Sequence, residues 1–308
     1  MPWLSALTSA VLMGLSWPHL KYSLEGRGYG LTMFLVLVAT YSAVQFLNSP
    51  RWTWGSLLTG TGLAMAMTVP SNLFFLGGLA VFTVLAGSLE WKESGQPIKK
   101  IFQISIPFLV MFVSIGIYFF IIYEGLKIGK DAHPLILDAI RTEKILGFLV
   151  APWGFWMYLF FVLGAWRLRR KREIILFISV ILIPIILTLL TAMVGFARTY
   201  VYWLPFVLFL SAYGMIELIS WLKKQIGNLA YGLGVGVVFL LVFSPAKKIS
   251  KYYKARDNGS LVVAGPNATL SEATKMAVWV DENIPENNLV VISVGGPESS
   301  VLTKYMKK

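Results

Sequence analysis

The stretch Ile174–Phe196, IILFISVILIPIILTLLTAMVGF, contains no aspartate, glutamate, lysine or arginine. A helix needs about 20 predominantly apolar residues to cross ~30 Å of hydrocarbon, and this stretch is long enough. Before it, separated only by Glu173, lies the basic sequence Arg167–Arg172, RLRRKR. Because such a cluster strongly resists translocation, the two features together predict a transmembrane helix that begins on the cytoplasmic side.

The same pattern recurs along the chain. The 308 residues are 56% hydrophobic and 14% charged, with a mean hydropathy of +0.69, whereas a soluble domain carries about 25% charged residues. The charges lie between long apolar runs, which argues against one large soluble core. Nine such runs predict about nine membrane spans: Pro2–Trp17, Gly30–Leu47, Trp54–Val69, Asn72–Leu89, Ile101–Tyr123, Ile145–Trp166, Ile174–Phe196, Tyr202–Leu222 and Asn228–Phe243.

The first run, and the third and fourth runs together, have features of their own. Pro2–Trp17 could be the apolar region of a signal peptide, but it lacks a basic n-region and a small-x-small cleavage site, so a retained first span is expected. Only Pro70 and Ser71 stand between the third and fourth runs, together with Val69 at the edge. The sequence therefore predicts a tight helical hairpin there.

Orientation follows from the basic residues. If Met1 is cytoplasmic, the inner loops hold more lysine and arginine than the outer loops, and Arg167–Arg172 is inside, as the positive-inside rule favours. The tail after residue 246 is then external, although it opens with the basic stretch Lys247–Arg256. Long translocated domains largely escape the charge rule. We expect an integral protein of the plasma (inner) membrane whose C-terminal segment lies outside.

The tail has a different character. Thr269–Glu272, TLSE, reads as a capping box at a helix start, and Leu289–Val294 is a β-type run that ends in Gly295-Gly296. One strand and one or two helices cannot bury a stable core by themselves. The predicted organisation is a transmembrane helical domain, 1–246, followed by the external segment 247–308, the start of a truncated α/β domain.

Composition also excludes several functions. The net charge of +12 is explained by cytoplasmic loops beside an anionic leaflet, so no nucleic-acid partner is expected. The chain has no cysteine and two histidines, His19 and His133, and these predict no metal site. No acidic or basic residue falls in mid-span, which disfavours an ion-coupled pump. The cofactor and the oligomeric state are not indicated.

The first candidate site is the loop Trp17–Tyr29, WPHLKYSLEGRGY. The Glu25 carboxylate could take a proton from an acceptor hydroxyl or amine. The Arg27 guanidinium could bind a phosphate with two N–H donors and neutralise its charge. The alternative is an interfacial loop in which Glu25 pairs with Arg27 and the tyrosines belong to an aromatic belt.

Two further clusters lie on the outer side. Arg198–Pro205, RTYVYWLP, sets an arginine among aromatics that could hold a lipid phosphate or a sugar; the alternative is a snorkelling arginine in an aromatic belt. Glu124–Lys144 mixes acidic and basic residues, and this composition is typical of a solvated amphipathic helix.

The stretch Leu15–Leu31, LSWPHLKYSLEGRGYGL, resembles an external-loop motif of the bacterial GT-C glycosyltransferases, the family-39-like enzymes related to protein O-mannosyltransferases and aminoarabinose transferases. Trp17 and Gly26 depart slightly from the motif, and the matching positions are Tyr22, Ser23, Glu25, Arg27 and Tyr29. The resemblance extends over nearly the whole chain and also includes Gly62–Leu79, Arg198–Pro205 and Ala273–Val294.

The resemblance implies transfer of a sugar from a polyprenyl-phosphate donor to an acceptor on the external face, with membrane lipid as the other partner. It implies Glu25 and Arg27 as catalytic residues. The expected substrate-binding residues are His19, Lys21, Tyr22, Tyr29, Arg198, Tyr200 and Tyr202. We expect Glu25, Arg27 and Arg198 to converge on one cavity at the external interface.

Members of the family place further spans and an acidic external loop before the region that this chain resembles. The chain is therefore expected to be an N-terminally truncated fragment, with little or no turnover by itself. Three alternatives stay open from the residues. They are an external-face polymerase or ligase of lipid-linked glycans, a non-catalytic membrane subunit, and a transporter.

Overall fold

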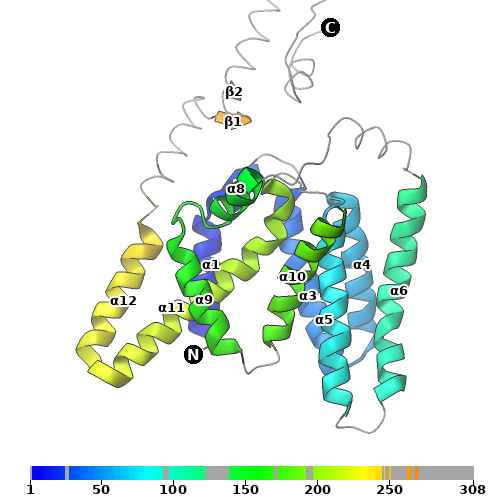
Figure 1. Ribbon diagram of the computed structural model, residues 1–308, viewed down its shortest axis with the longest axis horizontal. Helices are drawn as coiled ribbons and strands as arrows, with labels where there is room; N and C mark the ends of the chain where they lie inside the picture. Colours follow the sequence, from blue (N-terminus) through cyan, green and yellow to red (C-terminus); the bar gives the residue numbers. More distant parts are fainter. Residues whose placement is uncertain are drawn as a thin grey trace, which may run out of the picture. The chain divides into compact units, whose positions relative to one another are not determined.

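The computed structural model describes residues 2–24, 28–92, 97–121, 139–169, 173–191, 197–244, 246, 250, 262–264 and 268–269 (Figure 1). The chain divides into two compact units, Met1–Phe243 and Ser244–Lys308, and the division falls close to the predicted boundary after residue 246. The first unit is a bundle of helices in its described residues.

Each predicted apolar run overlaps at least one described helix. The described helices that correspond to these runs are α1 (Pro2–Leu15), α3 (Tyr29–Asn48), α4 (Trp52–Thr68), α5 (Asn72–Lys92), α6 (Pro97–Ile121), α9 (Trp156–Leu168), α10 (Glu173–Thr191), α11 (Leu204–Ile226) and α12 (Asn228–Phe243).

Fewer helices than predicted are long enough to cross a membrane. Among the described residues, five are both long and apolar enough: Tyr29–Asn48, Asn72–Leu89, Phe102–Ile121, Glu173–Leu190 and Arg198–Ile226. Three shorter apolar helices cover Trp3–Leu15, Trp156–Leu168 and Tyr231–Phe243. Large apolar side chains on the bundle surface, such as Phe120 at 84% and Leu190 at 77% exposed, suit contact with lipid.

The predicted span Ile145–Trp166 is wrong as a single helix. The chain forms α8 (Ala139–Leu149), then a turn with a cis Ala151-Pro152 bond and Gly154 at φ 78°, and only then α9. Proline has no N–H for the helical ladder, and its ring clashes with the preceding turn. Pro152 therefore ends the helix inside an apolar run that hydropathy alone reads as continuous.

The predicted loop Trp17–Tyr29 also begins as a helix, α2 (Trp17–Leu24). Ser16, which is fully buried, stands at its N-cap, and the Ser16 Oγ accepts a bond from the His19 N–H at 3.3 Å. A serine at this position satisfies an otherwise unpaired helix amide. The Trp17 N–H donates to the Ala151 carbonyl at 3.1 Å, so the start of α2 is joined to the turn that follows α8.

The tight hairpin between α4 and α5 is confirmed: α4 ends at Thr68 and α5 begins at Asn72. Asn72 is fully buried, and its Nδ2 donates to the Thr32 Oγ1 at 3.1 Å and to the Met65 carbonyl at 2.9 Å. One amide side chain thus joins α3, α4 and α5 at this end of the bundle.

The most extensive helix contacts are α9 with α11, α5 with α10, α3 with α4 and α1 with α11. Glycines permit the closest crossings: an added Cβ at Gly164 of α9 or Gly214 of α11 would meet backbone atoms of the other helix. At the far end of α9 from α8, the Arg167 Nε lies 3.7 Å from the Glu217 Oε2. Glu217 therefore points to a helix end and not into the core.

In the second unit, β1 (Val262–Ala264) pairs antiparallel with β2 (Ala268–Thr269), and Val262 lies opposite Thr269. The predicted helix after Thr269 and the predicted strand Leu289–Val294 lie outside the described residues. The external α/β segment therefore stays a prediction.

Candidate functional site

The predicted catalytic residues, Glu25 and Arg27, lie outside the described residues. Their convergence with Arg198 stays a prediction. The described members of the predicted site come from three elements, namely α2 with His19, Lys21 and Tyr22, α3 with Tyr29, and the 3-10 helix η1 (Ala197–Trp203) with Arg198, Tyr200 and Tyr202.

On the α2 side, an aromatic cluster surrounds Tyr22. This ring is 6% exposed, and its centroid lies 5.0 Å from that of Tyr29 and 5.6 Å from that of Phe148 in α8. The Lys21 Nζ lies 5.8 Å from the Tyr22 ring centroid. An added Cβ at Gly28 would meet Thr68, so a glycine lets the start of α3 approach the end of α4. The α2 side thus sets a cation beside a packed aromatic wall.

On the η1 side, the aromatic residues are packed inward. Tyr200 is 3% exposed and Tyr202 fully buried, with ring centroids 6.1 Å apart. The Tyr202 ring packs on Phe75 of α5 at 5.9 Å, and the Tyr200 hydroxyl lies 3.4 Å from the Thr188 Oγ1. Burial gives both rings a packing role at this end of the bundle, whereas Arg198 is half-buried.

These two regions, far apart in sequence, lie at one end of the bundle, which we call the α8 end: α2, α8, η1 and the α4–α5 turn (Figure 1). The Ser71 Oγ donates to the Thr199 carbonyl at 3.2 Å, which joins the α4–α5 turn to η1. Helix α8 contacts both α2 and η1. The chain therefore brings the described residues of its first and second candidate clusters to the same end.

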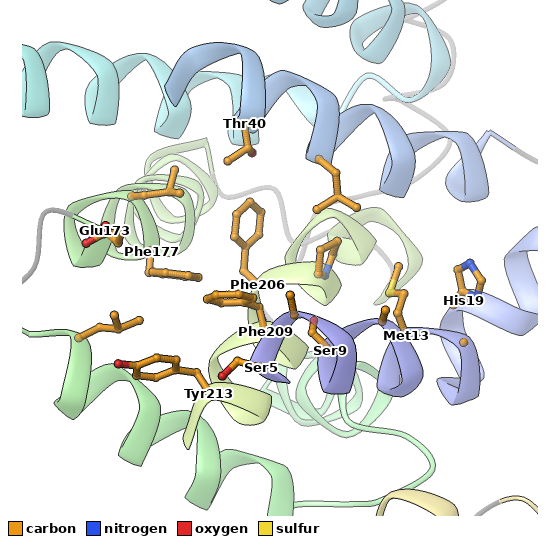
Figure 2. Close-up of a pocket in the computed structure, with 17 residues that line it drawn as sticks. Ser5, Ser9, Met13, His19, Thr40, Glu173, Phe177, Phe206, Phe209 and Tyr213 are labelled. Carbon is orange, nitrogen blue, oxygen red and sulfur yellow. The ribbon is translucent and has the colours of Figure 1, made fainter. Parts of the chain in front are cut away.

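A cavity of about 780 Å³ opens between α1, α3, α10 and α11, with contributions from α2 and α9. Its lining is mainly apolar, with the three rings Phe177, Phe206 and Phe209 in its middle (Figure 2). His19 lies at one end and Glu173 at the other (Figure 2). The cavity therefore runs from the α8 end toward the start of α10.

His19 is the predicted site residue that reaches this cavity. Its Nδ1 is buried and has no hydrogen-bond partner within the described part of the chain. Burial lowers the pKa of His19 below its ordinary value of 6.5. Burial therefore favours the neutral imidazole, in which one ring nitrogen donates and the other accepts a hydrogen bond.

Among the described residues, no group of three or more histidine, aspartate or glutamate side chains is placed to hold a metal ion. Sequence reasoning did not find Asn72, for which the only signal was a polar residue beside the hairpin turn. It also did not find Ser5 and Thr40 of the cavity, because no sequence pattern marks which faces of α1 and α3 border it.

Comparisons of the chain with family models, with curated proteins and with solved structures found no match.

Proposed function

We propose that the chain is the membrane part of a GT-C type glycosyltransferase. It would take a sugar from a polyprenyl-phosphate donor and pass it to an acceptor at the α8 end, which would be the external face of the plasma membrane. The observation that supports this proposal is that α2, which precedes Glu25 and Arg27 in the chain, and η1, which carries Arg198, both contact α8 at that end. Lys21 and Arg198 come from segments far apart in sequence, and both stand on elements that contact α8.

In the proposed reaction, the bond between the sugar C1 and the phosphate oxygen breaks as a bond forms from C1 to the acceptor oxygen or nitrogen. Glu25 takes the proton that the acceptor loses. Negative charge develops on the departing lipid phosphate, where the guanidinium groups of Arg27 and Arg198 stabilise it. A lipid phosphate fits this end because its head needs cations while its chain needs an apolar surface.

A second candidate is a carrier of lipids or lipid-linked molecules. It is favoured by one observation, the extension of the cavity from His19 at the α8 end to Glu173 at the start of α10 (Figure 2). An enzyme needs a site at one interface only, whereas a carrier needs a route between both. Movement of a labelled lipid between the leaflets of vesicles would support this candidate.

The transferase proposal is tested by binding of a short-chain polyprenyl phosphate to the purified chain in detergent. Arg198→Ala should weaken binding at least about tenfold, because a hydrogen bond to a charged group contributes about 1.5–3 kcal/mol. Arg198→Lys should recover only part, because an ammonium lacks the planar two-point grip. Arg51→Ala, in the exposed α3–α4 connection, is the matched control.

The same binding data can refute the proposal. If Arg198→Ala binds the phosphate as tightly as Arg51→Ala does, the α8 end is not a phosphate site. The chemical step has its own readout: Arg27→Ala should abolish sugar transfer in a preparation that shows it, while membrane insertion is unchanged.

A further inference from the structure

Three residues that line the cavity between α1, α3, α10 and α11 carry a buried polar atom with no partner among the described residues. Five buried side-chain nitrogen or oxygen atoms have no hydrogen-bond partner within the described part of the chain, and three of them, Ser5 Oγ, His19 Nδ1 and Thr40 Oγ1, belong to residues lining this one space. Ser5 is 1% exposed. Buried polar atoms are nearly always hydrogen-bonded, so the concentration of unpaired ones here points to a ligand.

The positions of these atoms define the kind of group that fits. Ser5 of α1 and Thr40 of α3 lie on opposite walls, with the rings of Phe177, Phe206 and Phe209 between them (Figure 2). Phe177 stacks on Phe209 at 5.8 Å with an interplanar angle of 12°. A serine or threonine hydroxyl can both donate and accept. A hydroxyl group on an apolar body can therefore bond to the Ser5 wall while the body lies against the rings.

Charge excludes an anionic head within the cavity. Among the described residues that line it there is no lysine or arginine, and the charged side chain there is Glu173. A phosphate placed between Ser5 and Thr40 would have no counterion and would be repelled by that carboxylate. Burying an unpaired charge is far more costly than burying a hydrogen-bonded hydroxyl. The neutral state of His19 agrees with an uncharged ligand.

The rest of the cavity suits a hydrocarbon chain. Ser5 and Gly14, which both line it, stand nine positions apart on α1, which is roughly 14 Å at 1.5 Å per residue. Between them the described wall is formed largely by small and apolar side chains such as Ala10, Met13 and Leu37. A volume of about 780 Å³ lies within the range of small-molecule sites, ~300–1,000 Å³.

We propose that this cavity binds a neutral long-chain alcohol of the membrane, with the alcohol hydroxyl at Ser5 and the chain along α1 toward His19. The hydroxyl end of the site, at Ser5, differs from the proposed phosphate site at the α8 end, which His19 borders, and it does not depend on sugar transfer.

The test uses a long-chain primary alcohol that carries a photoactivatable diazirine, with the phosphate monoester of the same chain as the comparison. The purified 308-residue chain in detergent should be labelled saturably, on peptides of α1 and α3. The alcohol should label at about tenfold lower concentration than its phosphate ester. Ser5→Ala combined with Thr40→Val, which removes the hydroxyl from both walls, should weaken the alcohol about fivefold, since one buried hydrogen bond contributes on that order.

Matched variants separate the site from the fold. Thr8→Val changes a hydroxyl on the same helix that lines the smaller groove of about 270 Å³ between α1, α11 and α12, and it should leave labelling unchanged. Gly14→Leu should block labelling by filling the cavity, and an added Cβ there meets nothing within 4 Å, so the fold should tolerate it. Circular dichroism confirms the folded state of each variant.

The proposal is overturned if labelling does not saturate, if the phosphate ester labels as well as the alcohol, or if the Ser5/Thr40 double variant is labelled like Thr8→Val. It is distinguishable from the transferase proposal because the two respond to different variants. Arg198→Ala should weaken phosphate binding and leave alcohol labelling intact, and the Ser5/Thr40 variant should do the reverse.

Discussion

Gly164 of α9 and Gly214 of α11 allow the closest helix crossing of the bundle to be tested directly. A Cβ added at Gly164 would meet the Leu210 carbonyl oxygen and would lie 3.2 Å from the Gly214 N. A Cβ added at Gly214 would meet the Phe160 carbonyl oxygen and would lie 2.9 Å from the Gly164 N. These are backbone atoms, which cannot rotate away as a side chain can. Gly164→Ala or Gly214→Ala must therefore push the two helices apart.

The expected change in the free energy of unfolding combines two costs and one gain. Overpacking costs about 1–3 kcal/mol, and separating the helices also lengthens the bond from the Ser211 Oγ to the Met157 carbonyl, now 2.9 Å, which contributes about 1 kcal/mol. Replacing a helical glycine with alanine returns about 0.5–1 kcal/mol. We expect a net loss of about 2 kcal/mol for either variant. The double variant should lose less than the sum, because one separation relieves both clashes.

Thermal unfolding of the purified protein in detergent, followed by circular dichroism, measures these changes. Gly60→Ala in α4 and Gly236→Ala in α12 are the controls, since an added Cβ at either position meets nothing within 4 Å. Both controls should be neutral or slightly more stable than the unchanged protein. If Gly164→Ala unfolds at the same temperature as Gly60→Ala, the close α9–α11 crossing is wrong.

Two further predictions concern buried polar side chains. Burial lowers the pKa of His19 below 6.5, so the unfolded chain binds a proton at a higher pH than the folded protein does. The unchanged protein should therefore keep its stability above about pH 6.5 and lose part of it as the pH falls toward the pKa of the folded protein. Melting temperatures between about pH 7.5 and 5.5 should fall more for it than for His19→Gln, and parallel curves would contradict the burial of this imidazole. Asn72→Ala, which removes the bonds to Thr32 and Met65, should lower stability by about 2–3 kcal/mol. Ser88→Ala, which removes an exposed bond to Leu85, should change stability little, and equal melting temperatures for the two would refute the role of Asn72.

Several features of the fold follow from local sequence. The uncharged run around Ile174 predicts a long apolar helix, and α10 covers most of it. The short interval between Thr68 and Asn72 predicts a hairpin, which α4 and α5 form. Pro152 carried a local signal as well. The prediction of spans counted apolar residues and gave no weight to the proline, which cannot continue a helix. The predicted span that contains Pro152 is therefore two helices, α8 and α9.

The candidate site was predictable only in part. Composition and motif identified His19, Tyr22 and Arg198 as residues of interest, but they did not show that Tyr22 is packed inside an aromatic cluster. They also did not show that His19 lines a cavity. Ser5 and Thr40 carry no motif, and they line one space only because α1 and α3 both border it.

By itself, the sequence determined that this protein is helical and suited to a membrane, because the transfer of an apolar side chain out of water depends on that side chain alone. Only the tertiary structure decided which helices are neighbours, as with the Gly164–Gly214 crossing and the pairing of α5 with α10. Lipid tails are as apolar as leucine, so hydropathy does not distinguish a face that meets lipid from one that meets another helix. Which faces meet another helix is decided by close approach at small residues and by interhelical hydrogen bonds. Both depend on residues that are distant in sequence.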